Sequence, residues 1–230
     1  MSTEVEEFPY NNMNILIEEE QVNKILRDYG ISFKCYNVDI YRKAFVHKSY
    51  ITRKNDNFVT GNKNCPQDCL PLQEQSYERF EYLGDSVLST TVANYLYQRY
   101  PDQNEGFLTK MRSKLVKTET LSNISKFLNL QEFLIISKNV EILSNGRNNS
   151  KLLEDLFESF IGAFMTDFSN KIDESYAYKL CTKFIINCIH KSIDFTELIK
   201  RDDNYKDQLM RYFQKKFDGS LPKYKLISQK

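Results

Sequence analysis

Apolar residues recur every three or four positions along most of this chain, which is the period of an amphipathic α-helix. The pattern therefore predicts a succession of helices and an all-α fold. Only 7 Gly and 5 Pro occur in 230 residues, so few breaks interrupt the pattern. The expected helices cover residues 15–29, 38–45, 76–100, 106–116, 121–130, 151–163, 174–198 and 205–217.

Three carboxylates share one face of the expected helix 76–100. Glu78, Glu81 and Asp85 are spaced three and then four residues apart, which stacks them along the helix. Like charges at this spacing repel one another, and a shared divalent cation or basic partners would remove that cost. The same helix is rich in apolar residues, so its carboxylates border a buried surface, where they are rarely without a partner.

A second acidic pair lies in the strongly apolar segment 151–163. Asp155 and Glu158 stand three residues apart there. Two helices could thus point four carboxylates at one place: Glu81, Asp85, Asp155 and Glu158. Oxygen ligands without histidine suit Mg²⁺, with Mn²⁺ as a substitute. Two such ions can clamp a phosphodiester for in-line displacement.

Five segments, all in the same order, resemble the ribonuclease III family. The nine residues Glu-Arg-Phe-Glu-Tyr-Leu-Gly-Asp-Ser at 78–86 are similar to the signature of that family, and 151–163 is similar to its other acidic motif. The remaining matches are 44–50, 105–116 and 205–228. The last of these is similar to the opening of a double-stranded-RNA-binding domain. The resemblance covers the chain from about Asn14 to its end.

The resemblance implies the helical nuclease-domain fold of that family and an endoribonuclease that cleaves double-stranded RNA. It implies 5′-phosphate and 3′-hydroxyl products with short 3′ overhangs. Glu81, Asp85, Asp155 and Glu158 would be both catalytic and metal-binding, with Glu78 as a supporting acidic residue. Basic residues on the helix after Pro101 would lie beside the duplex: Lys110, Arg112, Lys114 and Lys117. Specificity would rest on A-form shape and 2′-hydroxyl contacts.

The same resemblance implies a homodimer. In the family, the signature helices of two subunits pack across a two-fold axis, and Tyr82 matches an aromatic residue that fills a socket on the partner. The helix is apolar on more than one side, which also favours a covering partner. The alternative is that Tyr82 packs inside its own subunit.

Charge and composition divide the chain into three expected parts. Residues 1–13 form an acidic arm, 14–201 a nuclease domain, and 202–230 a linker with the start of an RNA-binding domain, including a strand at 223–228. The further strands of such a domain are not in the sequence, so the tail is expected to be truncated or degraded. The net charge of +1 excludes a uniformly basic RNA-coating protein, although the tail after residue 197 is basic.

Several features depart from the family pattern. Tyr77 stands where the family often has Asn, and Glu154 stands where Ala is usual. Adjacent helical residues do not share a face, so Glu154 is expected to point away from the carboxylates. The connection 51–75 is longer than in bacterial relatives. Its Cys65 and Cys69 suggest a zinc site only weakly, because no second ligand pair is nearby, and a surface loop with free thiols is favoured.

Two other classes of protein fit the sequence less well. A non-catalytic RNA-binding or scaffold protein on the same fold typically loses acidic ligands, whereas all four are present here. A carboxylate-bridged di-iron bundle needs Glu-x-x-His pairs, and neither His47 nor His190 follows a Glu at that spacing. No signal peptide or membrane-spanning run is found, so the default expectation is an intracellular protein in the cytoplasm, with nucleus or infected-host cytoplasm as alternatives.

Overall fold

The protein is described by a computed structural model that covers residues 9–52, 65–200 and 205–217. These residues form helices and no named strand, which confirms the predicted all-α fold. The α-helices are α1 (Glu19–Asp28), α2 (Val38–Ala44), α3 (Glu78–Arg99), α4 (Glu105–Leu115), α5 (Thr118–Phe127), α6 (Lys138–Leu143), α7 (Ser150–Lys171), α8 (Glu174–Ser192), α9 (Phe195–Lys200) and α10 (Tyr205–Lys216). Short 3₁₀ helices are η1 (Lys48–Tyr50), η3 (Leu130–Phe133) and η4 (Gly146–Asn148).

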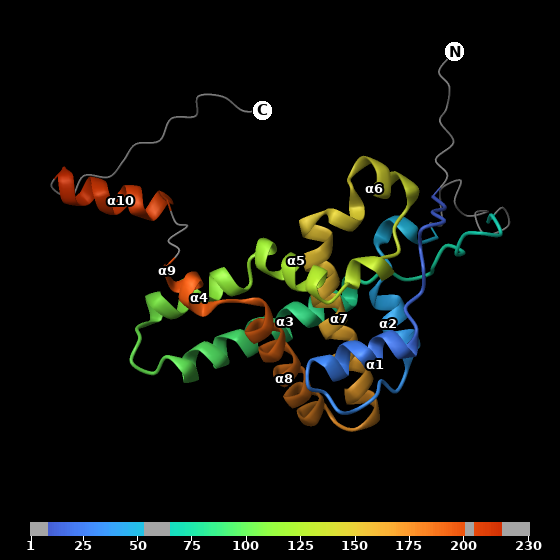
Figure 1. Ribbon diagram of the computed structural model, residues 1–230, viewed down its shortest axis with the longest axis horizontal. Helices are drawn as coiled ribbons and strands as arrows, with labels where there is room; N and C mark the ends of the chain where they lie inside the picture. The colour runs from blue at the N-terminus through green and yellow to red at the C-terminus, as the bar shows by residue number, and fades with distance from the viewer. Residues whose placement is uncertain (1–8, 53–64, 201–204, 218–230) are drawn as a thin grey trace, which may run out of the picture. The chain divides into compact units, whose positions relative to one another are not determined.

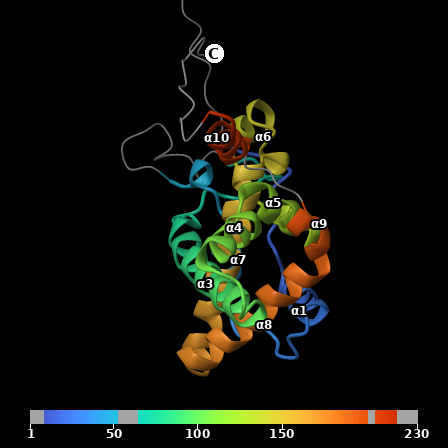
Figure 2. The same cartoon turned by 90° about the vertical axis from the view of Figure 1, so that its left-hand side faces the viewer.

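Helix α7 is the centre of the compact unit that extends to Ile193. It contacts α2, α3, α5 and α8, and Figures 1 and 2 show these helices arranged around it. Its phenylalanines pack with one another and with α8: the Phe164 ring lies 4.7 Å from that of Phe168 and 5.7 Å from that of Phe184. A helix that is apolar around its girth must be buried, and α7 is buried from Leu153 to Met165 without a break.

Helices α3 and α7 approach each other closely enough to touch backbone to backbone. A Cβ atom added to Gly84 would lie 1.7 Å from the carbonyl oxygen of Glu158, and one added to Gly162 would lie 2.0 Å from that of Phe80. Glycine in a helix interior costs up to about 1 kcal/mol relative to alanine. Here the missing side chains let the two acidic helices meet.

The first helix begins later than its pattern predicts. A helix was expected over 15–29, whereas α1 starts at Glu19. The reason is tertiary: the Asn14 side chain donates to the Ile136 carbonyl at 2.9 Å and accepts from the Ile136 N–H at 3.1 Å. This pairing ties the chain before α1 to a distant segment. Glu18 and Gln21 then form a capping box that starts the helix.

Three other local predictions were wrong. Helix α5 begins at Thr118, three residues before the helix expected over 121–130, with Lys117 as its N-cap. No helix was expected between residues 131 and 150, yet α6 and η4 lie in this stretch. The helix 174–198 is divided, because Ile193 adopts an extended conformation that ends α8.

The N-terminal segment and the connection before α3 both contain residues outside the described ranges. Residues 1–8 of the expected arm are outside; of the rest, Pro9, Tyr10 and Asn11 are buried, whereas Asn12 and Met13 are exposed. Residues 53–64 of the long connection are also outside, and Cys65 and Cys69 pack as free thiols against a small apolar cluster. The described part of this loop is therefore anchored to the core.

Residues from Asp194 onward form a separate unit. It contains α9 and α10, and α10 confirms the helix expected over 205–217. The strand expected at 223–228 lies outside the described residues. The domain boundary at residue 201 stays a prediction. In the part of the chain that the structure describes, no helix combines the length and apolar content needed to cross a bilayer.

His47 makes the stability of the fold sensitive to acid. Burial, and then the charge of Lys48, lowers the pKa of His47 to about 4, whereas Glu78 opposes the shift. The unfolded chain takes up this proton near its ordinary pKa of 6.5, so stability is fully present above pH 6.5 and is lost as the pH falls toward 4. The ring Nδ1 accepts from the Ser49 N–H.

A His47→Asn variant keeps an acceptor for that N–H but removes the titrating ring. Its free energy of unfolding is expected to depend less on pH between 6.5 and 4 than that of the wild type. Urea unfolding at several pH values measures this slope. Equal slopes in the two proteins would show that other groups cause the acid sensitivity.

Candidate metal centre

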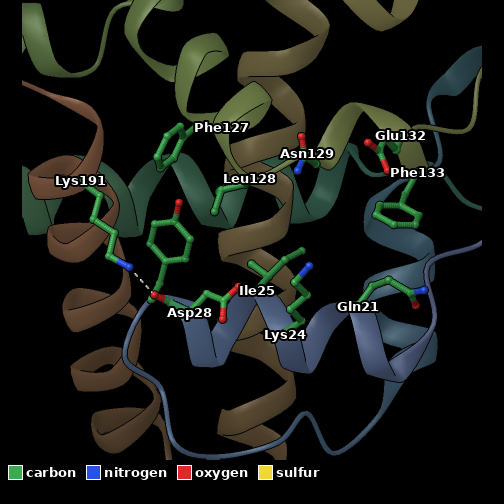
Figure 3. A pocket seen from close by; sticks show the side chains of 11 residues that line it. Gln21, Lys24, Ile25, Asp28, Phe127, Leu128, Asn129, Glu132, Phe133 and Lys191 are labelled. Atoms are coloured by element: carbon green, nitrogen blue, oxygen red, sulfur yellow. Dashed lines mark hydrogen bonds between the residues drawn. The ribbon is translucent and has the colours of Figure 1, made fainter.

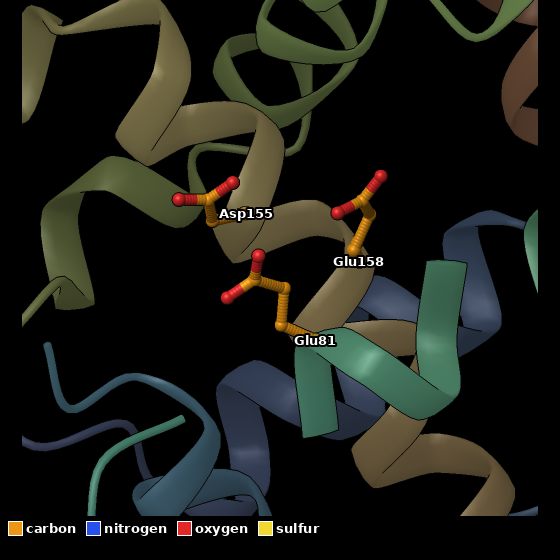
Figure 4. Close-up of side chains that lie close together, drawn as sticks. All are labelled: Glu81, Asp155 and Glu158. Carbon is orange, nitrogen blue, oxygen red and sulfur yellow. The ribbon is translucent and has the colours of Figure 1, made fainter. Parts of the chain in front are cut away.

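Three of the four predicted carboxylates converge at the crossing of α3 and α7. Glu81, Asp155 and Glu158 each offer an oxygen, and these oxygens lie within 4.8 Å of one another (Figure 4). Glu81 comes from α3 and reaches toward Asp155 and Glu158, which project from α7. In residues 9–52, 65–200 and 205–217, no other group of three such ligands meets this distance. We refer to Glu81, Asp155 and Glu158 as the carboxylate trio.

Local structure explains why these side chains meet. The Asn149 side chain caps α7 by accepting from the backbone N–H groups of Lys151 and Leu152. This cap sets the start of the helix, and Asp155 and Glu158 follow on adjacent turns. The close contact of Gly84 and Gly162 then brings Glu81 within reach. The site therefore depends on one cap and one helix crossing.

The other two acidic residues of α3 lie outside the trio. Asp85 is exposed, and the Ser89 hydroxyl donates to its Oδ1 at 3.4 Å. Its negative charge still raises the pKa of Glu158, so it borders the trio on that side. Glu78 is exposed and pairs with Lys48 at 3.5 Å. Their predicted metal-binding and supporting roles stay predictions.

Burial and mutual repulsion make the trio hard to ionise without a cation. Burial raises the pKa of Glu158 to about 8, and the charges of Asp85 and Glu154 add to the effect. Burial, followed by the charge of Asp155, raises the pKa of Glu81. Burial also raises the pKa of Asp155, which Lys151 partly lowers again. A bound dication would reverse these shifts by stabilising the charged forms.

The donor set fits a hard divalent cation. All three trio side chains offer oxygen, and two of them are buried, with Asp155 at 8% and Glu158 at 7% exposure. Asp155 Oδ1 is shielded from water and receives no hydrogen bond of regular geometry from the described residues. The Lys151 ammonium lies at an ion-pair distance of 2.8 Å from it. A buried oxygen with this little compensation is suited to a metal ion.

One residue of this site, Lys151, was not singled out by the sequence. Lys151 Nζ lies 2.8 Å from Asp155 and 3.1 Å from Glu154 Oε2. The signal was available, since Lys151 stands four residues before Asp155 and three before Glu154, which are the spacings of helical ion pairs. Glu154 is outside the trio, but the expectation that it points away from the carboxylates is wrong: it shares the Lys151 ammonium with Asp155, and its side chain is only 11% exposed.

Tyr77 lies behind Asp155. The residue is 2% exposed, and its ring lies 5.8 Å from that of His47. Burial and the adjacent Asp155 charge raise the pKa of Tyr77 well above its ordinary value. The phenol therefore stays protonated and presents a neutral polar group to Asp155. It stands where the resemblance led us to expect Asn.

The predicted RNA-binding residues differ in their exposure. Arg112 is exposed, Lys110 and Lys117 are half-buried, and Lys114 is only 8% exposed. Lys114 therefore does not belong to the outer face of α4 in this conformation. RNA binding by these four side chains stays a prediction. Tyr82 is 80% exposed, so it does not pack inside its own subunit.

A separate hollow lies between α1, α5, η3 and the end of α8 (Figure 3). Its polar lining has mixed charge, with Lys24 and Lys191 beside Asp28 and Glu132. The Lys191 ammonium already has a hydrogen-bond partner there, because it donates to the Asp28 carbonyl at 2.5 Å. No trio residue lines this hollow, so the candidate metal centre is distinct from it.

Comparison with protein families places the acidic helices in a known domain. The family described as "Ribonuclease III domain" matches residues 78–169. This interval contains all of the trio, the whole of α3 and all of α7 except its last two residues.

Curated relatives extend the similarity to most of the chain. A ribonuclease 3 of Leptospira interrogans is 35% identical over 208 residues, covering 90% of this chain and 73% of that protein. A probable ribonuclease 3 of Acanthamoeba polyphaga mimivirus is 28% identical over 224 residues, covering 96% of this chain. The chain spans only 39% of the length of the mimivirus protein.

Two solved structures have a fold similar to that of this chain. A crystal structure of the nuclease domain of ribonuclease III from Campylobacter jejuni superposes with a TM-score of 0.52 at 25% identity, covering 72% of this chain and 92% of that one. A second structure of that domain, which describes structural flexibility in a region involved in dimer formation, gives 0.53 at 24% identity, covering 75% and 98%.

Proposed function

The chain belongs to the ribonuclease III family, and we propose that it is an endoribonuclease that cleaves double-stranded RNA with the help of a divalent cation. The observation that carries the proposal is the convergence of Glu81, Asp155 and Glu158 within 4.8 Å. These side chains come from two helices and are held together by a backbone contact. Family membership supports double-stranded RNA as the substrate class, and the trio is proposed to bind the cation that assists cleavage.

The residues present divide the task. Glu81, Asp155 and Glu158 would hold Mg²⁺, with Asp85 close enough to Glu158 to assist or to hold a second ion. Bound there, the cation supplies activation of water and neutralisation of the phosphate charge during in-line displacement. Glu158 would release its proton to solvent when a cation binds near neutral pH, because its pKa without a cation is about 8. Hydrolysis would leave 5′-phosphate and 3′-hydroxyl ends.

We propose that the active form is a homodimer. Tyr82 is 80% exposed on α3, one residue after Glu81. The related Campylobacter domain has a region involved in dimer formation. Two subunits joined through their α3 helices would present one centre to each strand of a duplex, so paired cuts would leave short 3′ overhangs.

Cleavage of a long, end-labelled RNA duplex tests the proposal. The protein should cut the duplex in Mg²⁺ or Mn²⁺, stop when EDTA is added, and leave a single strand of the same sequence intact. End-group analysis with phosphatase and kinase then identifies the 5′-phosphate. Intact duplex in both metals, with the protein shown to be folded, would contradict the proposed function.

Truncation of Tyr82 tests the proposed assembly. A large aromatic side chain buried in the centre of an interface is a common hot spot, so Tyr82→Ala is expected to cost more than about 2 kcal/mol of association free energy. Sedimentation at micromolar concentrations measures the dimer constant. Phe127→Ala is the matched control, because Phe127 is also an exposed aromatic but lies on α5. A monomeric wild type, or equal dimerisation of Tyr82→Ala, would refute this assembly.

A further inference from the structure

Lys151 links a metal-ligating residue to a carboxylate that is not a ligand. Its Nζ lies 2.8 Å from Oδ1 of Asp155, within the trio, and 3.1 Å from Oε2 of Glu154, outside it. The two carboxylate side chains are 12% and 11% exposed, whereas that of Lys151 is 63% exposed. One exposed ammonium is thus shared by two nearly buried anions.

Neither buried oxygen has an adequate alternative partner. Among the described residues, Asp155 Oδ1 and Glu154 Oε2 receive no hydrogen bond of regular geometry. Lys151 is the cation nearest to both oxygens, although the charge of Lys48 and the Tyr77 hydroxyl also act on the Asp155 carboxylate. A cation bound by Asp155 would compensate that residue itself, and it would also repel the ammonium that now occupies the same oxygen.

We propose that Lys151 and Glu154 form an exchange pair that sets the metal affinity of the centre. In the metal-free protein Lys151 neutralises Asp155. When Asp155 binds a cation, the Lys151 ammonium pairs with Glu154 alone and stays at the edge of the site. Lys151 is therefore a competitor for the metal, and Glu154 is the positioning residue that receives it. This inference rests on the proposed function, because it assumes that the trio binds a divalent ion.

The exchange predicts opposite effects for the two partners. Lys151→Met removes the competing charge, so Mn²⁺ alone is expected to bind at least about tenfold more tightly. Lys151→Arg keeps the charge and is expected to remain within about threefold of wild type. Glu154→Gln removes the receiving group and leaves Lys151 committed to Asp155, so Mn²⁺ should bind at least about tenfold more weakly.

The double variant distinguishes exchange from simple addition of charges. If Glu154 acts by receiving Lys151, then Glu154→Gln should change the Mn²⁺ affinity by less than about threefold once Lys151→Met is already present. If Glu154 acted only as a distant negative charge, it would have the same effect in both backgrounds. The double-mutant cycle therefore measures the coupling that the shared ammonium creates.

Isothermal titration calorimetry with Mn²⁺, without RNA, at one pH and ionic strength gives the four affinities. Lys171→Met is the control, because Lys171 lies on the same helix about 24 Å along its axis from Asp155. Circular dichroism melts confirm that each variant is folded. Unchanged affinity in Lys151→Met, or an equal effect of Glu154→Gln in both backgrounds, overturns the exchange pair.

The wild type separates this inference from the function on which it rests. A wild type that binds Mn²⁺ and cleaves duplex RNA, with a Lys151→Met variant of the same affinity, refutes the exchange pair alone. A wild type that neither binds Mn²⁺ nor cleaves refutes both proposals. Tighter Mn²⁺ binding by Lys151→Met, together with a weakened Glu154→Gln that is rescued in the double variant, supports the exchange.

Discussion

Replacing Glu158 by glutamine is expected to reduce cleavage of double-stranded RNA by at least about 100-fold while leaving the fold intact. The amide has the shape of the carboxyl group but lacks the charge that holds a cation. Initial rates on a labelled duplex in Mg²⁺ measure the loss. Glu132→Gln is the matched control, because Glu132 is exposed and lies outside the trio. Full activity of Glu158→Gln would contradict the assignment of this residue.

The same variant should also have a stability that depends less on pH when no metal is present. Without metal, the raised pKa of Glu158 means that the folded protein keeps a proton that the unfolded chain releases above about its ordinary value of 4.5. Wild-type stability therefore falls as the pH rises from 4.5 to 8, and this fall should be smaller in Glu158→Gln. Thermal melts in EDTA measure it. Added Mg²⁺ should stabilise the wild type more than the variant.

Replacing Gly162 by alanine is expected to disrupt both the fold and the site. The new methyl group would meet the Phe80 carbonyl oxygen at 2.0 Å, and backbone cannot rotate aside as a side chain can. Helices α3 and α7 must separate, which costs more than about 2 kcal/mol and moves Glu81 away from Asp155. Cleavage rates and urea midpoints should fall together. Gly84→Ala should act in the same way, because its Cβ atom would lie 1.7 Å from the carbonyl oxygen of Glu158.

Gly106→Ala provides the control for these glycine variants. A Cβ atom at Gly106 has its nearest neighbour, the Asn104 side-chain oxygen, at 3.5 Å, which is ordinary contact. Alanine also favours a helix more than glycine does, so α4 should be unchanged or slightly stabilised. Equal destabilisation at Gly106 and Gly162 would show that the close crossing is not the cause.

The acidic centre was predictable because its residues follow helical spacing. The pairs in α3 and α7 and the oxygen-only chemistry could be read from the sequence, and three of the four carboxylates do converge. The position of Asp85 could not be read, because spacing gives a face of a helix but not the place where a second helix crosses it. That crossing is set by Gly84 and Gly162, whose role becomes visible only in three dimensions.

The missed local features have two kinds of cause. Helix α6 was overlooked because two of its three apolar residues, Ile142 and Leu143, are exposed at 66% and 82%, so they follow no inward-facing pattern. The late start of α1 depends on Asn14 pairing with Ile136, which no local rule anticipates. The break after α8 did have a signal: Asp194 accepts from the N–H groups of Thr196 and Glu197 and so begins a new helix.

The placement of the trio on two helices also has a kinetic consequence. Glu81 and Asp155 are separated along the chain by α4, α5 and α6, so their approach requires closure of a long loop. Loop entropy must be lost before this contact forms, and a contact that is absent from the folding transition state acts on the unfolding rate. A cation bound by both helices would then leave the folding rate nearly unchanged and slow unfolding. The ion would thus act as a kinetic clamp on the native state.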